Sequence, residues 1–192
     1  NRVLKNMIED FIDSEECPDD MKEDYETTKK ELDIIKAEAL YKKGKVLEAA
    51  NLGYPEAMGK MAENYSLAEG GFVKDEAKAF SFATKAANAG DVNGQSQLAW
   101  CYQMGIGVVK DYAAALIWYE RCIDKGYEVG LVNNNIGNIY YDGGHGVRRN
   151  LTKAVKHYRK AADLGDVWGQ CNLAGMYFDG EGVKQSFTEA RK

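Results

Sequence analysis

The chain has 192 residues, of which 45% are hydrophobic and 11% are aromatic, so it can bury a core and does not have the composition of a disordered protein. Its net charge is -5, and residues 1–52 hold 14 of the 30 acidic side chains but only 9 of the 25 basic ones, which leaves the remainder neutral. Neither part has the basic excess that nucleic-acid binding requires, and no run of about 20 apolar residues is present to cross a membrane.

The first predicted helix lies in residues 1–12, NRVLKNMIEDFI, where apolar side chains recur at helical spacing. This stretch resembles the last helix of a U-box, the ubiquitin-ligase module, and the matching residues are Asn1, Leu4, Met7, Ile8 and Phe11. The resemblance implies that residues 1–12 are the tail of an upstream U-box-like module in a longer ubiquitin ligase. An amphipathic helix without that relationship would show the same apolar face, so both interpretations stay open.

Residues 13–29 are predicted to be an acidic linker that runs into the start of a second helix. Residues 30–52 carry an apolar stripe that includes Leu32 and Ile35 and is interrupted near Gly44. We interpret this segment as a helical cap over the repeats that follow, because the end of a repeat array needs a polar outer face. A coiled coil is the alternative, but the stripe is shorter than the three or four heptads that would support one.

A repeat occupies residues 53–192, and its predicted units are 53–89, 90–125, 126–164 and a truncated 165–192. Each unit has an apolar stripe of helical period that ends on a tyrosine; the four tyrosines are Tyr65, Tyr102, Tyr140 and Tyr177. Glycines follow each stripe, and those expected to end the helix in a left-handed conformation are Gly105, Gly143 and Gly180. A second helix then begins at an expected N-cap, which is in turn Asp75, Asp111, Asn150 and Ser186.

The repeat resembles the Sel-1-like repeat family, a relative of the tetratricopeptide repeats. The resemblance rests on a small-x-x-x-Leu-Ala-x-x-Tyr helix, a Gly-x-Gly-Val-x-x-Asp turn and an Ala-x-x-Trp-Tyr-x-x-Ala-Ala-x-x-Gly helix. It implies a protein-interaction scaffold. The fold expected is all-α: a right-handed α-solenoid of antiparallel helix pairs with an N-terminal helical cap. Because the sequence starts at Asn1 and stops at Lys192 inside a helical pattern, we also expect it to be a piece of a longer protein.

No catalytic, cofactor-binding or metal-binding residue is predicted. The two histidines, His145 and His157, lack a catalytic partner, and the cysteines show no Cys-x-x-Cys spacing. The Gly-x-Gly turns lack a preceding strand and a lysine of the kind that binds phosphate, so a nucleotide site is not expected. We interpret the four cysteines as reduced thiols, three of them packed in helices, which favours an intracellular, cytoplasmic protein.

The predicted function is the binding of a protein or peptide partner on the concave face, which the first helix of each unit would line. The candidate binding residues are Asn93, Trp100, Gln103, Leu131, Asn134, Asn138, Tyr141, Trp168 and Phe178. Aromatic rings supply apolar contact area and amides can hold a peptide backbone. Two alternatives remain: Trp100 and Trp168 could instead pack against the next unit, and the array could be the substrate-recruiting region of a U-box-type ubiquitin ligase.

Overall fold

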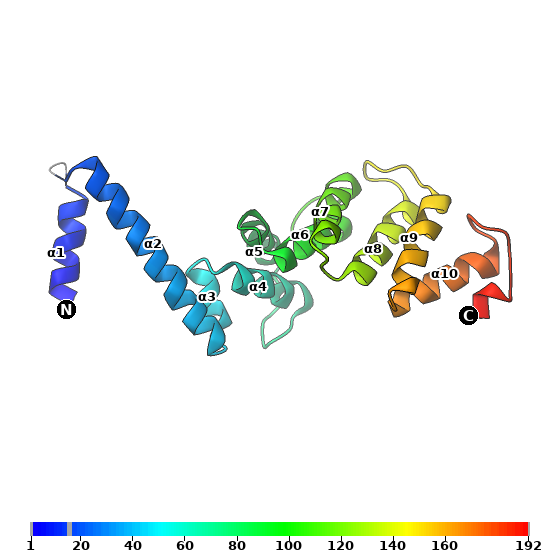
Figure 1. Cartoon of the computed structure of the whole chain (residues 1–192), viewed down its shortest axis with the longest axis horizontal. Coiled ribbons are helices and arrows are strands. Elements are labelled where there is room, and N and C mark those ends of the chain that lie inside the picture. Colours follow the sequence, from blue (N-terminus) through cyan, green and yellow to red (C-terminus); the bar gives the residue numbers. More distant parts are fainter. Residues whose placement is uncertain (1, 15–16, 192) are drawn as a thin grey trace. The chain divides into compact units, whose positions relative to one another are not determined.

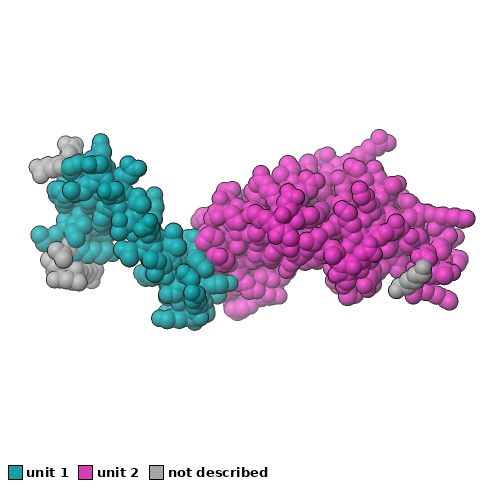
Figure 2. Space-filling view, in the orientation of Figure 1, with its two compact units in different colours: residues 1–54 teal, residues 55–192 magenta. Residues whose placement is uncertain are grey.

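The computed structural model of the chain describes residues 2–14 and 17–191, with side chains from Lys5 onward. These residues form ten α-helices and one short 3-10 helix, and no strand occurs among them (Figure 1). The chain divides into two compact units, residues 1–54 and residues 55–192 (Figure 2). The predicted all-α fold is confirmed.

The first unit contains α1 (Arg2–Ile12), α2 (Asp19–Lys42) and α3 (Val46–Asn51). The predicted interruption is present: Gly44 has a φ of +77° between α2 and α3, which pack against each other. The apolar side chains of α1 and α2 are mostly exposed, and these are Met7, Ile8, Phe11, Met21, Leu32, Ile34 and Ile35. The capping role of residues 30–52 stays a prediction.

Helix α1 coincides with the segment that resembles the end of a U-box. Met7, Ile8 and Phe11 are exposed on it. Asn1 lies outside the described residues, and so does the side chain of Leu4. The helical conformation was expected under either interpretation of this segment, so it does not distinguish between them.

The second unit is built from successive helix pairs, and consecutive helices pack side by side (Figure 1). The elements are α4 (Pro55–Leu67) and α5 (Glu76–Asn88), α6 (Val92–Met104) and α7 (Tyr112–Asp124), α8 (Val129–Asp142) and α9 (Leu151–Asp163), and α10 (Val167–Asp179) with the 3-10 helix η1 (Glu189–Arg191). The predicted right-handed α-solenoid of antiparallel helix pairs is confirmed. The stripe that ends on each repeat tyrosine forms the first helix of its pair.

Three second helices begin at the residues expected to cap them. The carboxylates of Asp75 and Asp111 and the side-chain oxygen of Asn150 each accept a hydrogen bond from the backbone N–H three residues later, at 3.0, 2.9 and 2.9 Å. Ser186 caps only a short 3-10 turn, since its Oγ accepts from the N–H of Glu189 at 3.3 Å.

First helices α6 and α10 have caps that the sequence patterns did not reveal. Asp91 and Asp166 accept from the N–H groups of Gly94 and Gly169, both at 2.6 Å. Helix α8 differs, because its N-cap position is Glu128, which has a left-handed backbone and no side-chain capping bond. The third unit has two more residues than the others between its first glycine, Gly126, and its repeat tyrosine, Tyr140, and Glu128 lies in this longer segment.

The turn glycines have positive φ angles, and one of them differs from the expected conformation. Gly105 and Gly180 are left-handed, with φ/ψ of 77°/36° and 74°/26°. Gly143 has a φ of 66° but a ψ of -177°, a region that only glycine occupies readily. The reason lies in the length of this turn, which has one residue more between Tyr140 and Asn150 than the second unit has between Tyr102 and Asp111. Within it, Gly144 and Val147 exchange two backbone hydrogen bonds of 2.7 and 2.9 Å.

The helical stripes are the core of the second unit. Met61, Leu98 and Ile136 are buried at the equivalent large apolar position of the first three pairs, whereas Leu173 in α10 is half-buried. The cysteines depart from the expectation of three packed helical thiols: Cys101 and Cys122 are buried, but Cys171 is exposed on α10 and Cys17 is buried outside any helix. All four cysteines are free thiols.

Candidate interaction groove

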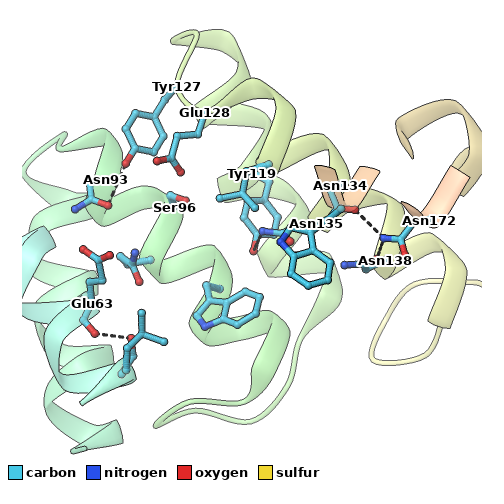
Figure 3. A pocket seen from close by; sticks show the side chains of 16 residues that line it. Glu63, Asn93, Ser96, Tyr119, Tyr127, Glu128, Asn134, Asn135, Asn138 and Asn172 are labelled. Carbon is cyan, nitrogen blue, oxygen red and sulfur yellow. Dashed lines mark hydrogen bonds between the residues drawn. The ribbon is translucent and has the colours of Figure 1, made fainter. Parts of the chain in front are cut away.

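A groove of about 690 Å³ runs over the second unit and is lined by 16 side chains (Figure 3). Most of them come from the first helices α4, α6, α8 and α10, while Tyr119 comes from α7 and Tyr127 and Glu128 from the turn before α8. The lining residues are Glu63, Ser66, Leu67, Asn93, Ser96, Gln97, Trp100, Tyr119, Tyr127, Glu128, Leu131, Asn134, Asn135, Asn138, Trp168 and Asn172.

The structure brings six of the nine candidate binding residues into this groove: Asn93, Trp100, Leu131, Asn134, Asn138 and Trp168. Three lie outside it. Gln103 is buried and accepts a hydrogen bond from the Tyr119 hydroxyl at 2.8 Å. The ring of Tyr141 lies 5.3 Å from the guanidinium of Arg149, and the exposed ring of Phe178 lies 5.3 Å from that of Phe187.

The position relative to the repeat tyrosine distinguishes the candidates inside the groove from those outside it. Each residue outside the groove directly follows its repeat tyrosine, whereas the six inside it lie nine, six or two positions before that tyrosine. The position five before the tyrosine was missed, and it contributes Gln97, Asn135 and Asn172 to the groove. Helical spacing was the signal that could have found them, because each lies four residues after a candidate: Asn93, Leu131 or Trp168.

The apolar surface of the groove consists of two indoles and two leucines. Trp168 is 68% exposed, and Leu67 and Leu131 are exposed as well, while Trp100 is half-buried. Trp168 lies on α10, the first helix of the fourth unit, so the alternative that it packs against a following unit stays a prediction. Exposed apolar side chains gathered in one groove are typical of a surface that binds a partner.

Glu63 lies at one end of the groove, and side-chain amides line the other end (Figure 3). Asn172 donates from Nδ2 to Oδ1 of Asn134 at 2.8 Å and to Oδ1 of Asn138 at 3.3 Å. The Tyr158 hydroxyl donates to the same Asn138 oxygen at 2.8 Å. These bonds turn the two oxygens toward the protein, and the Nδ2 groups of Asn134 and Asn138 have no partner among the described residues.

The two unpartnered amide groups keep only limited exposure, since Asn134 is buried, with 4% of its surface exposed, and Asn138 is half-buried. Among the buried side-chain polar atoms of the described chain, only Oε1 of Gln95 lacks a hydrogen-bond partner, so the free Nδ2 groups of the groove are not sealed in the interior. Asn93 is arranged in the same way, since its Oδ1 accepts from the Tyr127 hydroxyl at 3.2 Å. The groove therefore presents hydrogen-bond donors, which suit the carbonyl oxygens of a peptide backbone.

Tyr119 is the floor of the groove. It is fully buried, and its hydroxyl donates to Gln103 and accepts from Nδ2 of Asn135 at 3.3 Å. Burial raises the pKa of this phenol well above its ordinary range. The ring carries no chemistry of its own at neutral pH and instead positions Asn135 beneath the groove.

No group of three histidine, cysteine, aspartate or glutamate side chains that could hold a metal ion occurs among the described residues. The helices in that part of the chain also include none with the length and apolar character needed to span a membrane. His145 lies in an exposed turn with a φ of +46°, in ring contact with Tyr112. His157 stacks on Tyr140, away from the groove residues.

His157 belongs to a polar contact between α8 and α9. Its Nδ1 lies 2.9 Å from Oδ1 of Asn133, whose own Nδ2 donates to the Val129 carbonyl at 2.7 Å. Because the Asn133 oxygen faces the ring, Nδ1 carries the proton and donates. Burial, and after it the like charge of nearby lysines, together lower the pKa of His157 to about 4.

We expect His157 to make the stability of the second unit depend on pH. The unfolded histidine takes up a proton near pH 6.5 and the folded one only near pH 4, so between these values the unfolded chain binds more protons. Its contribution to stability is therefore complete above pH 6.5 and declines as the pH falls toward 4.

The measurement is urea unfolding, followed by circular dichroism from pH 7.5 to pH 4.5, of the wild type and of His157→Phe, which keeps a ring against Tyr140. The stability difference between the two proteins should shrink as the pH falls below 6.5. His145→Asn, which suits the left-handed backbone of that turn, is the matched control. A difference that stays constant over this range would contradict the assignment.

A family model of the Sel1 repeat matches four segments of the chain, residues 55–91, 92–127, 132–166 and 169–192, which together make up more than half of it. The third and fourth matches begin inside α8 and α10, and the gap before the third contains Glu128.

Several curated proteins are similar to this chain in sequence. Cytochrome c oxidase assembly factor 7A of Xenopus laevis is 28% identical over 145 residues, which cover 71% of this chain and 61% of that protein. The ERAD-associated E3 ubiquitin-protein ligase component HRD3B of Arabidopsis thaliana is 30% identical over 60% of this chain and 18% of its own length. Protein sel-1 homolog 2 of Mus musculus is 31% identical over 60% of the chain and 16% of its own length. The match therefore spans less than two thirds of each of these relatives.

Solved structures agree with the fold. A protective antigen of uropathogenic Escherichia coli, described as displaying an SLR fold, superposes with a TM-score of 0.64 at 30% identity, covering 86% of this chain and 37% of that one. A Sel1 repeat protein from Oxalobacter formigenes superposes with a TM-score of 0.62 at 27% identity, covering 82% of this chain and 65% of that one.

Proposed function

The chain belongs to the Sel1 repeat family, and from that premise we propose that it is an interaction scaffold whose groove binds an extended segment of a partner protein. Proteins built from Sel1 repeats generally mediate protein–protein interactions, and their fold is typically a non-catalytic scaffold. The identity of the groove as the binding surface, and of an extended peptide as its occupant, is the part that we propose.

One observation supports the proposal above the others: the groove combines the exposed indole of Trp168 and the half-buried indole of Trp100 with amide donors that have no partner among the described residues. An extended peptide offers a carbonyl oxygen at every residue, and the Nδ2 groups of Asn134 and Asn138 have no competing partner in the described chain. Its side chains would contact Trp100 and Trp168, which supply apolar area at low entropic cost. The two amides lose little conformational entropy on binding, because Asn172 and Tyr158 already hold their oxygens by hydrogen bonds.

The test is a selection of dodecapeptides, displayed on phage, against the whole chain, followed by fluorescence anisotropy with one selected peptide. The double variant Trp100→Ala/Asn138→Ala should weaken binding by about thirtyfold, the typical loss for an aromatic anchor in an interface. Tyr141→Ala is the matched control, because Tyr141 lies on the same helix as Asn138 but outside the groove. Circular dichroism verifies that both variants fold.

Full affinity in the double variant would move the binding surface out of the groove. Loss of affinity in Tyr141→Ala alone would instead place it around the residues that follow the repeat tyrosines.

A second candidate function is the recruitment of substrates to a U-box-type ubiquitin ligase. Helix α1 presents Met7, Ile8 and Phe11 to solvent, the residues that resemble the end of a U-box, and one relative is named as a ubiquitin-ligase component. Sequencing the transcript upstream of the codon for Asn1 tests it. A U-box there would support this function, and a further Sel1 repeat would refute it.

A further inference from the structure

The charged side chains that line the groove have one sign. They are Glu63 and Glu128, and the lining contains no lysine, arginine or histidine. Figure 3 shows both carboxylates on the side of the groove that carries Asn93 and Ser96, away from Asn134, Asn138 and Asn172. The groove is therefore acidic at one end and neutral, with amides, at the other.

Glu128 lines the groove from a position where the backbone is unusual. Its φ of +39° and ψ of 43° are left-handed, which is uncommon for a residue with a side chain. The described chain provides Glu128 with no ion pair and no capping role. A carboxylate without a structural partner on the wall of a groove remains available to a ligand.

Glu63 has one cationic neighbour, since its Oε2 lies 2.8 Å from Nζ of Lys60, one helical turn away. Partly exposed pairs at this spacing contribute little free energy, so a ligand cation can share the carboxylate. Lys125 donates to the Gly90 carbonyl at 3.0 Å and does not line the groove.

The environment of Tyr127 shows that the two carboxylates act on the same region. Burial, and after it the negative charges of Glu128, Asp91 and Glu63, together raise the pKa of this phenol to about 12. Its hydroxyl is also the group that donates to Asn93 at 3.2 Å. A cation near this hydroxyl would thus interact with Glu63 and Glu128 together.

We infer that the partner segment is basic: a lysine or arginine lies between Glu63 and Glu128, while apolar side chains of the same segment contact Trp100 and Trp168. This inference rests on the proposed function, because it specifies which peptide the groove takes. Charge complementarity is its argument, since both charged side chains of the groove lining are negative and a cation between them would be attracted to each. The indoles add to it, because the stem of a lysine or the plane of an arginine packs well on an aromatic ring.

The experiment compares dodecapeptides selected from phage display by three forms of the whole chain: the wild type, Glu63→Gln/Glu128→Gln and Glu120→Gln/Asp124→Asn. The last variant changes the net charge equally, but its residues lie on α7 outside the groove. The wild type and this control should select peptides enriched in lysine and arginine over the unselected library. The groove variant should select apolar peptides without that enrichment.

One selected peptide is then compared with a version in which serine replaces each lysine and arginine. For the wild type, anisotropy should show about tenfold weaker binding of the serine peptide, with a difference that shrinks between 50 mM and 500 mM salt. The groove variant should bind the two peptides within about twofold of each other.

The outcomes separate the inference from the function on which it rests. If the wild type selects no peptide that binds in solution, the proposed function fails. If it selects peptides that lose affinity in Trp100→Ala/Asn138→Ala but show no basic enrichment, the function stands and the basic partner is wrong. Enrichment that persists in Glu63→Gln/Glu128→Gln would also overturn the inference.

Discussion

Replacing Gly94 with alanine is expected to destabilise the second unit by about 3 kcal/mol, at the upper end of the range for overpacked cores. Alanine is otherwise the better helix former by about 1 kcal/mol, so the expected sign is opposite to that of helix propensity. The reason is the approach of α6 to α5: a Cβ at Gly94 would collide with the Cβ of Ala86 and lie 2.9 Å from the backbone of both Ala86 and Ala87. Backbone atoms cannot move aside without separating the helices.

Gly175→Ala is the matched control, because the same substitution is made within a first helix but in open space. No atom lies within 4 Å of an added Cβ at Gly175 on α10, so alanine should raise stability by up to about 1 kcal/mol. Urea unfolding followed by circular dichroism measures both variants. If the two substitutions changed stability in the same direction, the close contact between α5 and α6 would be disproved.

Replacing Tyr119 with alanine is expected to lower the free energy of unfolding by about 4 kcal/mol, within the usual range for the loss of a large buried aromatic side chain. Tyr119 is fully buried in the core shared by α6, α7 and α8, where Ile136 and Ile139 are its buried neighbours. Its removal leaves a cavity and deprives Gln103 and Asn135 of their hydrogen-bond partner. The groove should lose its floor, and peptide affinity should fall together with stability.

Tyr119→Phe distinguishes the ring from the hydroxyl. This substitution keeps the packing of the ring and removes only the hydrogen bonds of the hydroxyl. Because the buried amide of Gln103 then lacks its partner, we expect the free energy of unfolding to fall by about 1–3 kcal/mol. Thermal unfolding with and without a selected peptide measures both effects. Equal losses in the alanine and phenylalanine variants would show that the ring does not contribute to the core as the structure indicates.

Local signals in the sequence predicted most of the second unit. Asp75, Asp111 and Asn150 are predicted as caps because each has a short polar side chain directly before a helical apolar pattern, where it can accept a hydrogen bond from a free backbone N–H. Each one makes the expected hydrogen bond. The turn glycines were identified for a similar reason, since a positive φ is costly for other residues. Gly143 differed in ψ because its turn has an extra residue, which no single-residue preference describes.

The candidate binding site was predicted less completely. Helical spacing alone places the residue after each repeat tyrosine on the same face as the residues two and six positions before that tyrosine. Whether such a residue reaches the groove depends on its neighbours in space: Tyr119 covers Gln103, and Arg149 covers the ring of Tyr141. These neighbours belong to another helix or to a turn. A pattern within the first helix therefore does not predict that they lie next to it.

The helical repeat, its core positions, the caps of its second helices and the aromatic and amide character of its first helices can be predicted from the amino-acid sequence. Each depends on the conformational preference of one residue or on the spacing of residues within one helix. The position of Glu63 and Glu128 on the same side of one groove, and the hydrogen bonds that occupy the oxygens of Asn134 and Asn138, follow only from the packing of the helices. Glu63 and Glu128 belong to different helix pairs, so the packing of successive pairs, and not the sequence of either one, sets the charge of the groove.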